Sequence, residues 1–568
     1  MKKSTYLTWV CVVACALHLP TVSEGQKVPN QDKNYALVPK LPPPPKPEPF
    51  KVSTIPLPES VIDAVLVNYL PDAKHLVMEV TMAGAKKSNL AIMKDDGTGF
   101  KCLTCDLPEN IGGEMPVPLP DGKRIYTPTG ILECSPSVLD CKQAKILPLV
   151  YPTVPGGKTL ARIASNMSQD GLHVAYTLLV ARPMPSALVL VSELTRVSDA
   201  KGDHYELAKT KVISGDKVTL EGAADFRPFF FGGGEVKSFA GMGQYLTTIS
   251  AFEAGNFDIA KIDLTNGDVS RFTRHFSYDE GVYPSPDGKW VIFQSHRHTT
   301  RMDAFSLIPR PLIVNNALAP GIAEWRNEEI SGFRDARRYY GLTMTDQYGD
   351  RARLPEEGYT GQNLTTASDN LTEYNHFGNL TWHPSSTRGI FWEQKDPKKV
   401  KTGEQMGRLR MITFTSRKPT TPLKIVTPTM DWATNLADIK PLDNSKRTEG
   451  KLVGLVSGYA NITNQKPASE GAASAGPSTF KIEYVDFSDD GAYVLNGSET
   501  IVPASFYDAI WNADIQVTGK QKGYLKVDDV KFYVNKRGSG TIKAQLGNRK
   551  IEVDLTKGLP TGVPNELR

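Results

Sequence analysis

Short runs of alternating apolar and polar residues recur along the chain, and most of them meet at a turn that contains Asp-Gly. The clearest unit is 281–298, in which the turn Ser285-Pro286-Asp287-Gly288 separates an apolar run from the alternating run Trp290 to Gln294. Alternation with a period of two predicts a half-buried strand, and two such runs around a Gly-containing turn predict a β-hairpin. Weaker copies of the unit lie at 69–79, 118–126, 166–176 and 380–393.

Repeated hairpin units of about 45 to 60 residues predict an all-β chain built around a β-propeller. We place the propeller at 59–430 and count six blades, with seven as the alternative. Inside it, 310–375 is predicted to be a long insertion with one helical pattern, Glu328 to Tyr340. Before it, 26–58 is predicted to be a proline-rich linker. After it, alternating strands in 431–568 predict a C-terminal β-sandwich-like domain.

The opening unit also resembles a known repeat. The Ser285-Pro-Asp-Gly288 turn, the alternating strand after it and the triplet Ser295-His296-Arg297 are similar to the TolB-like, WD-type propeller repeat, and the resemblance covers roughly 60–430. It implies the fold and leaves the function open.

The first 25 residues are predicted to be a signal peptide, because Lys2 and Lys3 precede an apolar stretch that ends in small residues. A lipidation box ending at Cys15 is the alternative. We therefore expect a secreted protein with no membrane contact in its mature form. Six sequons are predicted to carry glycans: Asn166, Asn363, Asn370, Asn379, Asn461 and Asn496.

Four cysteines remain beyond the predicted signal peptide: Cys102, Cys105, Cys134 and Cys141. In an exported chain an even number favours two disulfides, and all three pairings stay open. A zinc site made by the same four residues is the alternative.

Charge and missing motifs exclude several functions. A formal net charge of +4 over 568 residues, without a basic block, argues against nucleic acid as a partner. The sequence has no Gly-x-Ser-x-Gly elbow, no His-Glu-x-x-His and no phosphate-binding loop, which disfavours serine hydrolases, zinc proteases and nucleotide enzymes.

One end of the predicted propeller collects ionisable residues. In a blade, residues before the first strand and after the second strand share one end, and we call this end the rim. Glu280 and Glu393 reach it from different blades, as the two carboxyl groups of a glycosidase would. The residues expected to bind the substrate there are Asp279, His296, Arg297, His298, Arg301 and His376. A purely structural alternative is that Arg297 ties neighbouring blades together and that both glutamates are solvated.

A second resemblance concerns function. The expected secretion, the cysteines around Glu133-Cys134 and the runs 275–289 and 295–305 resemble the fungal saponin hydrolases. Those are secreted enzymes that remove a glucuronic-acid-linked sugar chain from triterpene saponins. The resemblance therefore implies a glycosidase whose partner is a small-molecule glycoside. Two alternatives stay open: a non-catalytic propeller that binds a glycan or protein, and a metal-dependent uronate lyase. The lyase would hold a divalent metal, the only cofactor considered, with Gln294, His296, His298 and His376.

Overall fold

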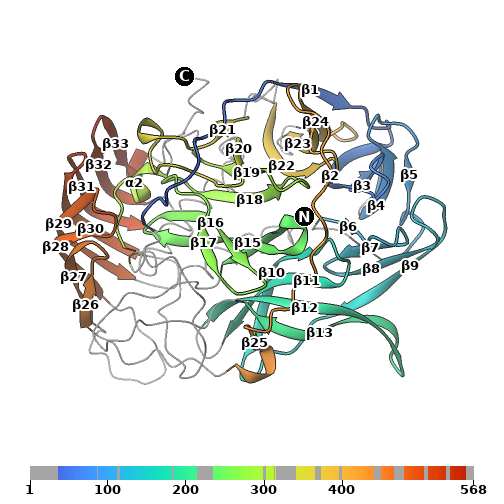
Figure 1. Cartoon of the computed structure of the whole chain (residues 1–568), viewed down its shortest axis with the longest axis horizontal. Coiled ribbons are helices and arrows are strands. Elements are labelled where there is room, and N and C mark those ends of the chain that lie inside the picture. Colours follow the sequence, from blue (N-terminus) through green and yellow to red (C-terminus); the bar gives the residue numbers. More distant parts are fainter. Residues whose placement is uncertain are drawn as a thin grey trace.

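A computed structural model describes residues 36–557, apart from 86, 110, 112–114, 182–184, 214–233, 298–301, 312–313, 315–340, 365–372, 396–399, 440–448, 466–478, 504–508 and 533–537. The described chain consists almost entirely of strands arranged in two parts (Figure 1). The first part is a six-bladed β-propeller, as the repeat count predicts, and the second is one large antiparallel sheet.

The propeller blades are antiparallel meanders that follow one another in sequence order. Blades 2 and 3 are joined into a single sheet by the parallel pairing of Tyr205 and Glu206 with Leu149 and Val150. Blade 1 contains β2 (Val61–Tyr69), β3 (His75–Met82), β4 (Ser88–Lys94) and β5 (Lys101–Cys102); blade 2 contains β6 (Val117–Pro118), β7 (Arg124–Thr127), β8 (Gly130–Pro136) and β9 (Cys141–Val150); blade 3 contains β10 (Lys158–Met167), β11 (His173–Ala181), β12 (Pro185–Asp199) and β13 (Gly202–Val212). Blade 4 contains β14 (Glu235–Ala240), β15 (Tyr245–Glu253), β16 (Asn256–Asp263) and β17 (Val269–Arg271); blade 5 contains β18 (Asp279–Pro284), β19 (Trp290–Ser295), β20 (Gly341–Asp346) and β21 (Gln362–Asn363); blade 6 contains β22 (Tyr374–Trp382), β23 (Arg388–Lys395) and β24 (Gly407–Phe414).

The fourth strand of blade 6 comes from the other end of the propeller sequence. β1 (Phe50–Ile55) pairs antiparallel with β24, with Phe50 opposite Phe414, and so closes the ring. The prediction of a linker over 26–58 was therefore wrong for its last residues. The proline-rich run ends just before Phe50, and a strand begins where backbone N–H groups become available for pairing.

The predicted insertion, 310–375, is also corrected, because it contains β20 and β21, which complete blade 5. It looked like an insertion because a long stretch separates β19 from β20, so the strand-to-strand spacing of the other blades is lost. The helical pattern Glu328 to Tyr340 lies outside the described residues.

The repeated turn is held by its aspartate. Asp287 accepts hydrogen bonds from the Ser285 hydroxyl at 2.6 Å and from the Lys289 backbone N–H at 3.1 Å, and Gly288 adopts φ +72°. A left-handed backbone and an Asx-type contact are what this turn chemistry requires. The turn residues therefore specify the fold, and they lie at the end of the propeller opposite the rim.

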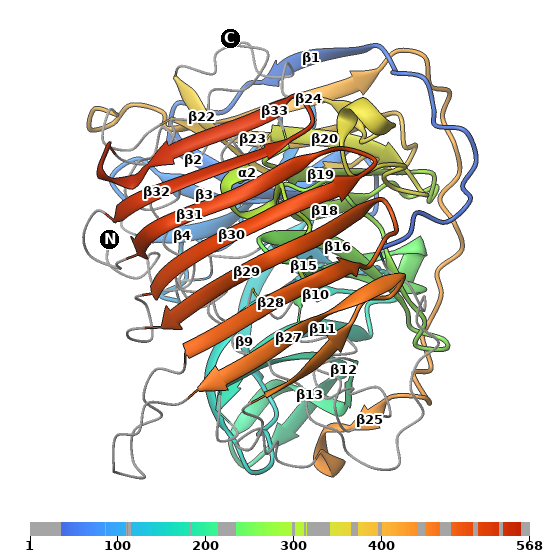
Figure 2. The ribbon, with the colours of Figure 1, turned by 90° about the vertical axis from the view of Figure 1, so that its left-hand side faces the viewer.

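The C-terminal part is one eight-stranded antiparallel sheet in simple sequence order (Figure 2). Its strands are β26 (Glu449–Val453), β27 (Ser457–Gln465), β28 (Thr479–Ser488), β29 (Tyr493–Pro503), β30 (Ala509–Gly519), β31 (Gly523–Phe532), β32 (Ser539–Leu546) and β33 (Arg549–Asp554). Alternating burial along β30 shows that one face is buried and the other solvated. The buried face packs on α2 (Asp303–Ser306), where Phe305 stacks on Trp511, so propeller residues take the place of a second sheet.

The four cysteines form two disulfides, Cys102–Cys105 and Cys134–Cys141. This confirms the prediction of disulfides and settles the pairing that the sequence left open. Such bonds are typical of exported proteins, and secretion itself stays a prediction. Among the described residues, no helix has the length and hydropathy needed to cross a membrane.

Candidate active site at the rim of the propeller

Glu280 lies at the rim, at the start of the inner strand of blade 5. Lys237, from the inner strand of blade 4, places its ammonium group 2.8 Å from Glu280 and 2.8 Å from Glu235. The Tyr278 hydroxyl donates a second hydrogen bond to Glu280 at 2.9 Å. With about a fifth of its side chain exposed, Glu280 is an accessible carboxylate whose negative charge is stabilised by a cation from the neighbouring blade.

Asp63 occupies the equivalent place in blade 1 and was missed by the sequence analysis. The Gln394 amide, from blade 6, donates to one of its carboxyl oxygens at 2.5 Å, while the other, Oδ1, is buried without a hydrogen-bond partner. Burial, with a further contribution from the charge of Glu79, raises the pKa of Asp63 to about 7. Asp63 can therefore carry a proton near neutral pH, which is what a general acid needs.

Glu393 does not reach the rim surface. It is fully buried, and it forms an ion pair with Arg408 at 2.5 Å and lies 3.9 Å from Arg410, both on the adjacent strand β24. Arg408 also stacks on the ring of Tyr374 at 3.8 Å. The prediction of Glu393 as a catalytic carboxyl is corrected, because its charge is committed to holding two arginines within blade 6.

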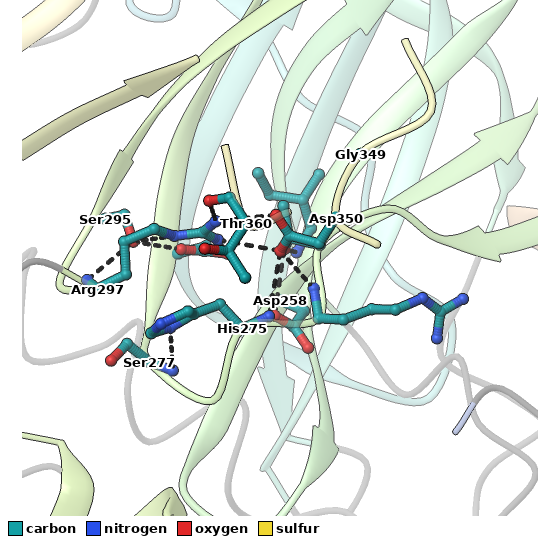
Figure 3. Close-up of polar contacts among 12 residues, drawn as sticks. Asp258, His275, Ser277, Ser295, Arg297, Gly349, Asp350 and Thr360 are labelled. Carbon is teal, nitrogen blue, oxygen red and sulfur yellow. Dashed lines mark hydrogen bonds and ion pairs between the residues drawn. The ribbon is translucent and has the colours of Figure 1, made fainter. Parts of the chain in front are cut away.

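Asp279 and Arg297 are also buried and stabilise the fold. Figure 3 shows Arg297 beside Ser295, Thr360 and Asp350. Arg297 pairs with Asp279 at 2.5 Å and with Asp350 at 2.9 Å, and it also donates to Ser295 and to the Thr360 carbonyl. Asp350 in turn accepts the backbone N–H groups of Arg274 and His275, which lie in the connection between blades 4 and 5. Arg297 thus ties together the parts of blade 5 and, through Asp350, the connection from blade 4; the structural alternative had it joining neighbouring blades directly.

Two pKa shifts describe this network. Burial raises the pKa of Asp279 to about 6, although the neighbouring positive charge of Arg297 opposes the shift. The two carboxylates in turn raise the pKa of Arg297 despite its burial, so the guanidinium stays charged. A guanidinium enclosed in this way has no donor directed at the rim, so we remove Asp279 and Arg297 from the substrate-binding set.

Two of the four predicted metal ligands, Gln294 and His296, have described side chains, and among the described residues no three His, Cys, Asp or Glu side chains cluster as a metal would require. Gln294 accepts a hydrogen bond from the Tyr283 hydroxyl at 3.1 Å, and His296 is buried with its ring edge-on to Tyr278. His298 and Arg301 lie outside the described residues. For His376 only the backbone is described, in β22 opposite Gln394.

The sequons differ in their surroundings. The Asn379 side chain is buried, donating to the Val67 carbonyl and accepting from Trp392, and the Asn166 amide donates to the Lys237 carbonyl. A glycan is attached through this amide nitrogen, so in the folded chain both positions are poorly placed to carry one. The glycosylation of Asn363, Asn461 and Asn496 stays a prediction, and Asn370 lies outside the described residues.

Comparison with known proteins finds similar chains among solved structures. No family model matches the chain, and no curated protein matches it. TolB from Acinetobacter baumannii is 16% identical with a TM-score of 0.31, over 61% of this chain and 65% of that one. An oligogalacturonate lyase in complex with manganese is 10% identical with a TM-score of 0.33, over 66% of this chain and 99% of that one.

A third solved structure, prolyl oligopeptidase B from Galerina marginata, is 11% identical with a TM-score of 0.28, over 74% of this chain and 46% of that one. At such low identities and TM-scores these likenesses carry no argument. The fold is established by the strand pairing. The chain is a six-bladed β-propeller with an added eight-stranded sheet. The resemblance to saponin hydrolases gains no support from these comparisons.

The residues missed by the sequence analysis had different signals. Asp63 precedes its turn, Pro71-Asp72, much as Glu280 precedes Asp287, so the rule that identified Glu280 also applied to it. Lys237 had no such signal, because blade 4 lacks the Ser-Pro-Asp-Gly turn. Its inner strand becomes evident only once β14 is seen to pair with β15.

Proposed function

We propose that the rim cleaves a glycosidic bond in a glycoside that carries a uronic acid, such as a saponin glucuronide. The observation that supports this is the contrast between two rim carboxyl groups: Asp63, which can hold a proton near pH 7, and Glu280, which is held as an anion by Lys237. A pair of carboxyls with different protonation is the requirement shared by most glycosidases.

In this proposal Asp63 protonates the leaving oxygen and Glu280 acts as base or nucleophile. Protonation by a positioned acid contributes about 10²- to 10⁴-fold to the rate. The neutral form of Asp63 is favoured because the surroundings offer the carboxylate little hydration. Lys237 holds Glu280 in place and stabilises its charge until the bond breaks.

The uronic acid would be recognised at blade 6. Two guanidinium groups, Arg408 and Arg410, lie at 2.5 Å and 3.9 Å from the Glu393 carboxylate, so cationic side chains gather in this blade. The Arg408 side chain is partly exposed and lies against Tyr374, whose ring could support a sugar. A charge-assisted hydrogen bond from Arg408 to the uronate would contribute about 1.5 to 3 kcal/mol.

The test is to incubate the purified full chain with soyasaponin and with p-nitrophenyl glucuronide and to measure released sugar. We expect Asp63→Asn and Glu280→Gln each to lower kcat by about 10²-fold or more. Asp303→Asn is the matched control: burial also raises the pKa of Asp303 to about 7, but it lies under the C-terminal sheet. Activity retained by both rim variants would remove the site assignment.

The two alternatives give different outcomes in the same assay. A wild-type chain that binds saponin without releasing sugar would be the non-catalytic binder. Release of an unsaturated uronate that stops on adding a chelator would be the metal-dependent lyase. Hydrolysis that continues in the chelator, with a saturated product, supports the glycosidase.

A further inference from the structure

A cavity of about 250 Å³ lies between blades 4 and 5, on the turn side of the propeller and away from the rim. Blade 4 contributes Tyr245, Thr247 and Lys261 to its wall, and blade 5 contributes Val282 and Val291. The cavity therefore extends the apolar contact between these blades, which contains Val282, Val291 and Phe272.

The cavity also has a cover from outside the two blades. Leu423 lines it, and the backbone N–H of Leu423 donates to the Pro286 carbonyl at 2.9 Å. Farther along the same segment, the Val426 N–H donates to the Met242 carbonyl at 2.8 Å. The chain that follows blade 6 thus crosses blades 5 and 4 and forms one side of the cavity.

Lys261 is the single charged residue in this lining. Its ammonium group lies 4.6 Å from the centre of the Tyr245 ring, and no described carboxylate is within ion-pairing distance of it. Burial lowers the pKa of Lys261, which the charge of Asp263 only partly opposes. Lys261 is a half-buried cation beside an aromatic ring, with the Asp263 carboxylate beyond ion-pairing distance, so it lacks the close partner that usually offsets such burial.

The rest of the lining limits what the partner can be. The walls are mostly apolar, and the neutral amides of Gln244 and Gln347 also line the cavity. The Gln244 amide donates one hydrogen bond to Asp263 at 3.1 Å, and an amide nitrogen has a second N–H that can bond an anion. The volume is smaller than that of typical drug-sized sites. These features fit a small molecule with an apolar body and one negatively charged end.

We propose that this inter-blade cavity binds a small carboxylate, whose anionic end pairs with Lys261 and whose apolar body packs against Val282, Val291 and Leu423. This binding site is separate from the rim and does not depend on the proposed glycosidase. It gives the propeller a second ligand, held where two blades and the segment after blade 6 meet.

The test is calorimetric titration of the purified full chain with hexanoate, near pH 6, and with hexanamide as its neutral analogue. We expect hexanoate to bind about tenfold or more tightly than hexanamide, because only the acid supplies a charge-assisted hydrogen bond. Lys261→Met, which keeps the length and apolar stem of the side chain, should weaken hexanoate binding about tenfold or more and erase the preference over hexanamide. Lys261→Arg should retain the preference.

Lys451→Met is the matched control, because Lys451 also lies over an aromatic ring, that of Tyr459, at 3.8 Å but in the C-terminal sheet. It should bind hexanoate as the wild type does, and Glu280→Gln at the rim should do so as well. A wild type that binds no hexanoate at millimolar concentration would overturn the proposal. So would a Lys261→Met variant that keeps its secondary structure and binds hexanoate as the wild type does.

Discussion

Arg297 and Asp63 both lie toward the rim end of the propeller, and both are largely buried, yet their surroundings differ. Arg297 is enclosed by two carboxylates, a hydroxyl and a backbone carbonyl, and it stacks on Phe293 at 4.7 Å. Asp63 has one neutral amide partner and one buried oxygen without any partner. The Arg297 guanidinium therefore has hydrogen-bond partners on all sides, whereas the surroundings of Asp63 disfavour its ionised form.

Whether a buried charged group has enough partners distinguishes structural residues from candidate catalytic residues more reliably than residue type does. Blade 4 repeats the satisfied arrangement, since Arg271 pairs with Asp258 and Glu253 and lies over Phe252. An arginine–carboxylate arrangement that recurs in neighbouring blades stabilises the blades. In the Asp63 arrangement a carboxyl lies beside a second acid, Glu79, and no cation in the described part of the chain offsets the charge. Such an arrangement costs stability and calls for another explanation.

The largest effect is expected from breaking the satisfied network. Arg297→Met removes the cation and leaves Asp279 and Asp350 buried beside each other without it, which should lower the free energy of unfolding by about 3 to 5 kcal/mol. Urea denaturation followed by tryptophan fluorescence measures this loss.

The control for this change neutralises the partners as well. In Arg297→Met/Asp279→Asn/Asp350→Asn no charge is left unpaired, so much of the lost stability should return. A single variant as stable as the wild type would show that Arg297 does not hold the blade, and it would return Arg297 to the candidates for substrate binding.

The next largest effect concerns Asp63 and the pH dependence of stability. Asp63 has its pKa raised from 3.8 to about 7, so the folded chain holds this proton more tightly than the unfolded chain. Its protonation therefore stabilises the fold at low pH, and this contribution is lost as the pH rises from about 4 through about 7. Asp63→Asn lacks the titration, so its stability relative to the wild type should increase over that range by up to about 4 kcal/mol.

Denaturation midpoints of both proteins between about pH 5 and about pH 8 test this, because the two curves should diverge. Asp303→Asn should diverge from the wild type in the same direction, since burial raises the pKa of Asp303 as well. The two variants should differ in activity, which only Asp63→Asn should lose. Parallel stability curves would mean that Asp63 is ionised throughout and cannot serve as the acid.

The sequence predicts the blades well because turn chemistry is local. Asp287 and Gly288 determine their turn through contacts within a few residues, so the repeat is visible in one dimension. The closing strand β1 is not visible in this way. Its partner, β24, lies more than three hundred residues away, and its exposed edge position weakens the alternation of burial.

The site is less predictable for the same reason. Strand direction correctly assigns Glu280 and Glu393 to one end of the propeller, but it cannot tell an accessible carboxyl from a buried one. The environment of each carboxyl depends on its partner, Lys237 for Glu280 and Arg408 for Glu393. Each partner lies on a different strand from its glutamate. The raised pKa of Asp63 likewise depends on its burial and on the charge of Glu79, which only the folded chain brings to it.

The smallest effect separates the two glutamates that the sequence treats as equivalent. Glu393→Gln keeps the shape and a hydrogen-bond acceptor for Arg408 but removes the charge between two arginines, so the free energy of unfolding should fall by about 2 kcal/mol. Because the side chain is fully buried, catalysis should change only modestly, through a shift of Arg408 that raises KM for a glucuronide.

Glu280→Gln should show the opposite pattern, with a large loss of kcat and a smaller loss of stability, because its side chain is partly exposed. Steady-state kinetics and urea denaturation of the two variants, measured side by side, decide between them. If Glu393→Gln lost kcat while Glu280→Gln kept it, the chemistry would belong to the enclosed carboxylate, and the inference from charge satisfaction would fail at this rim.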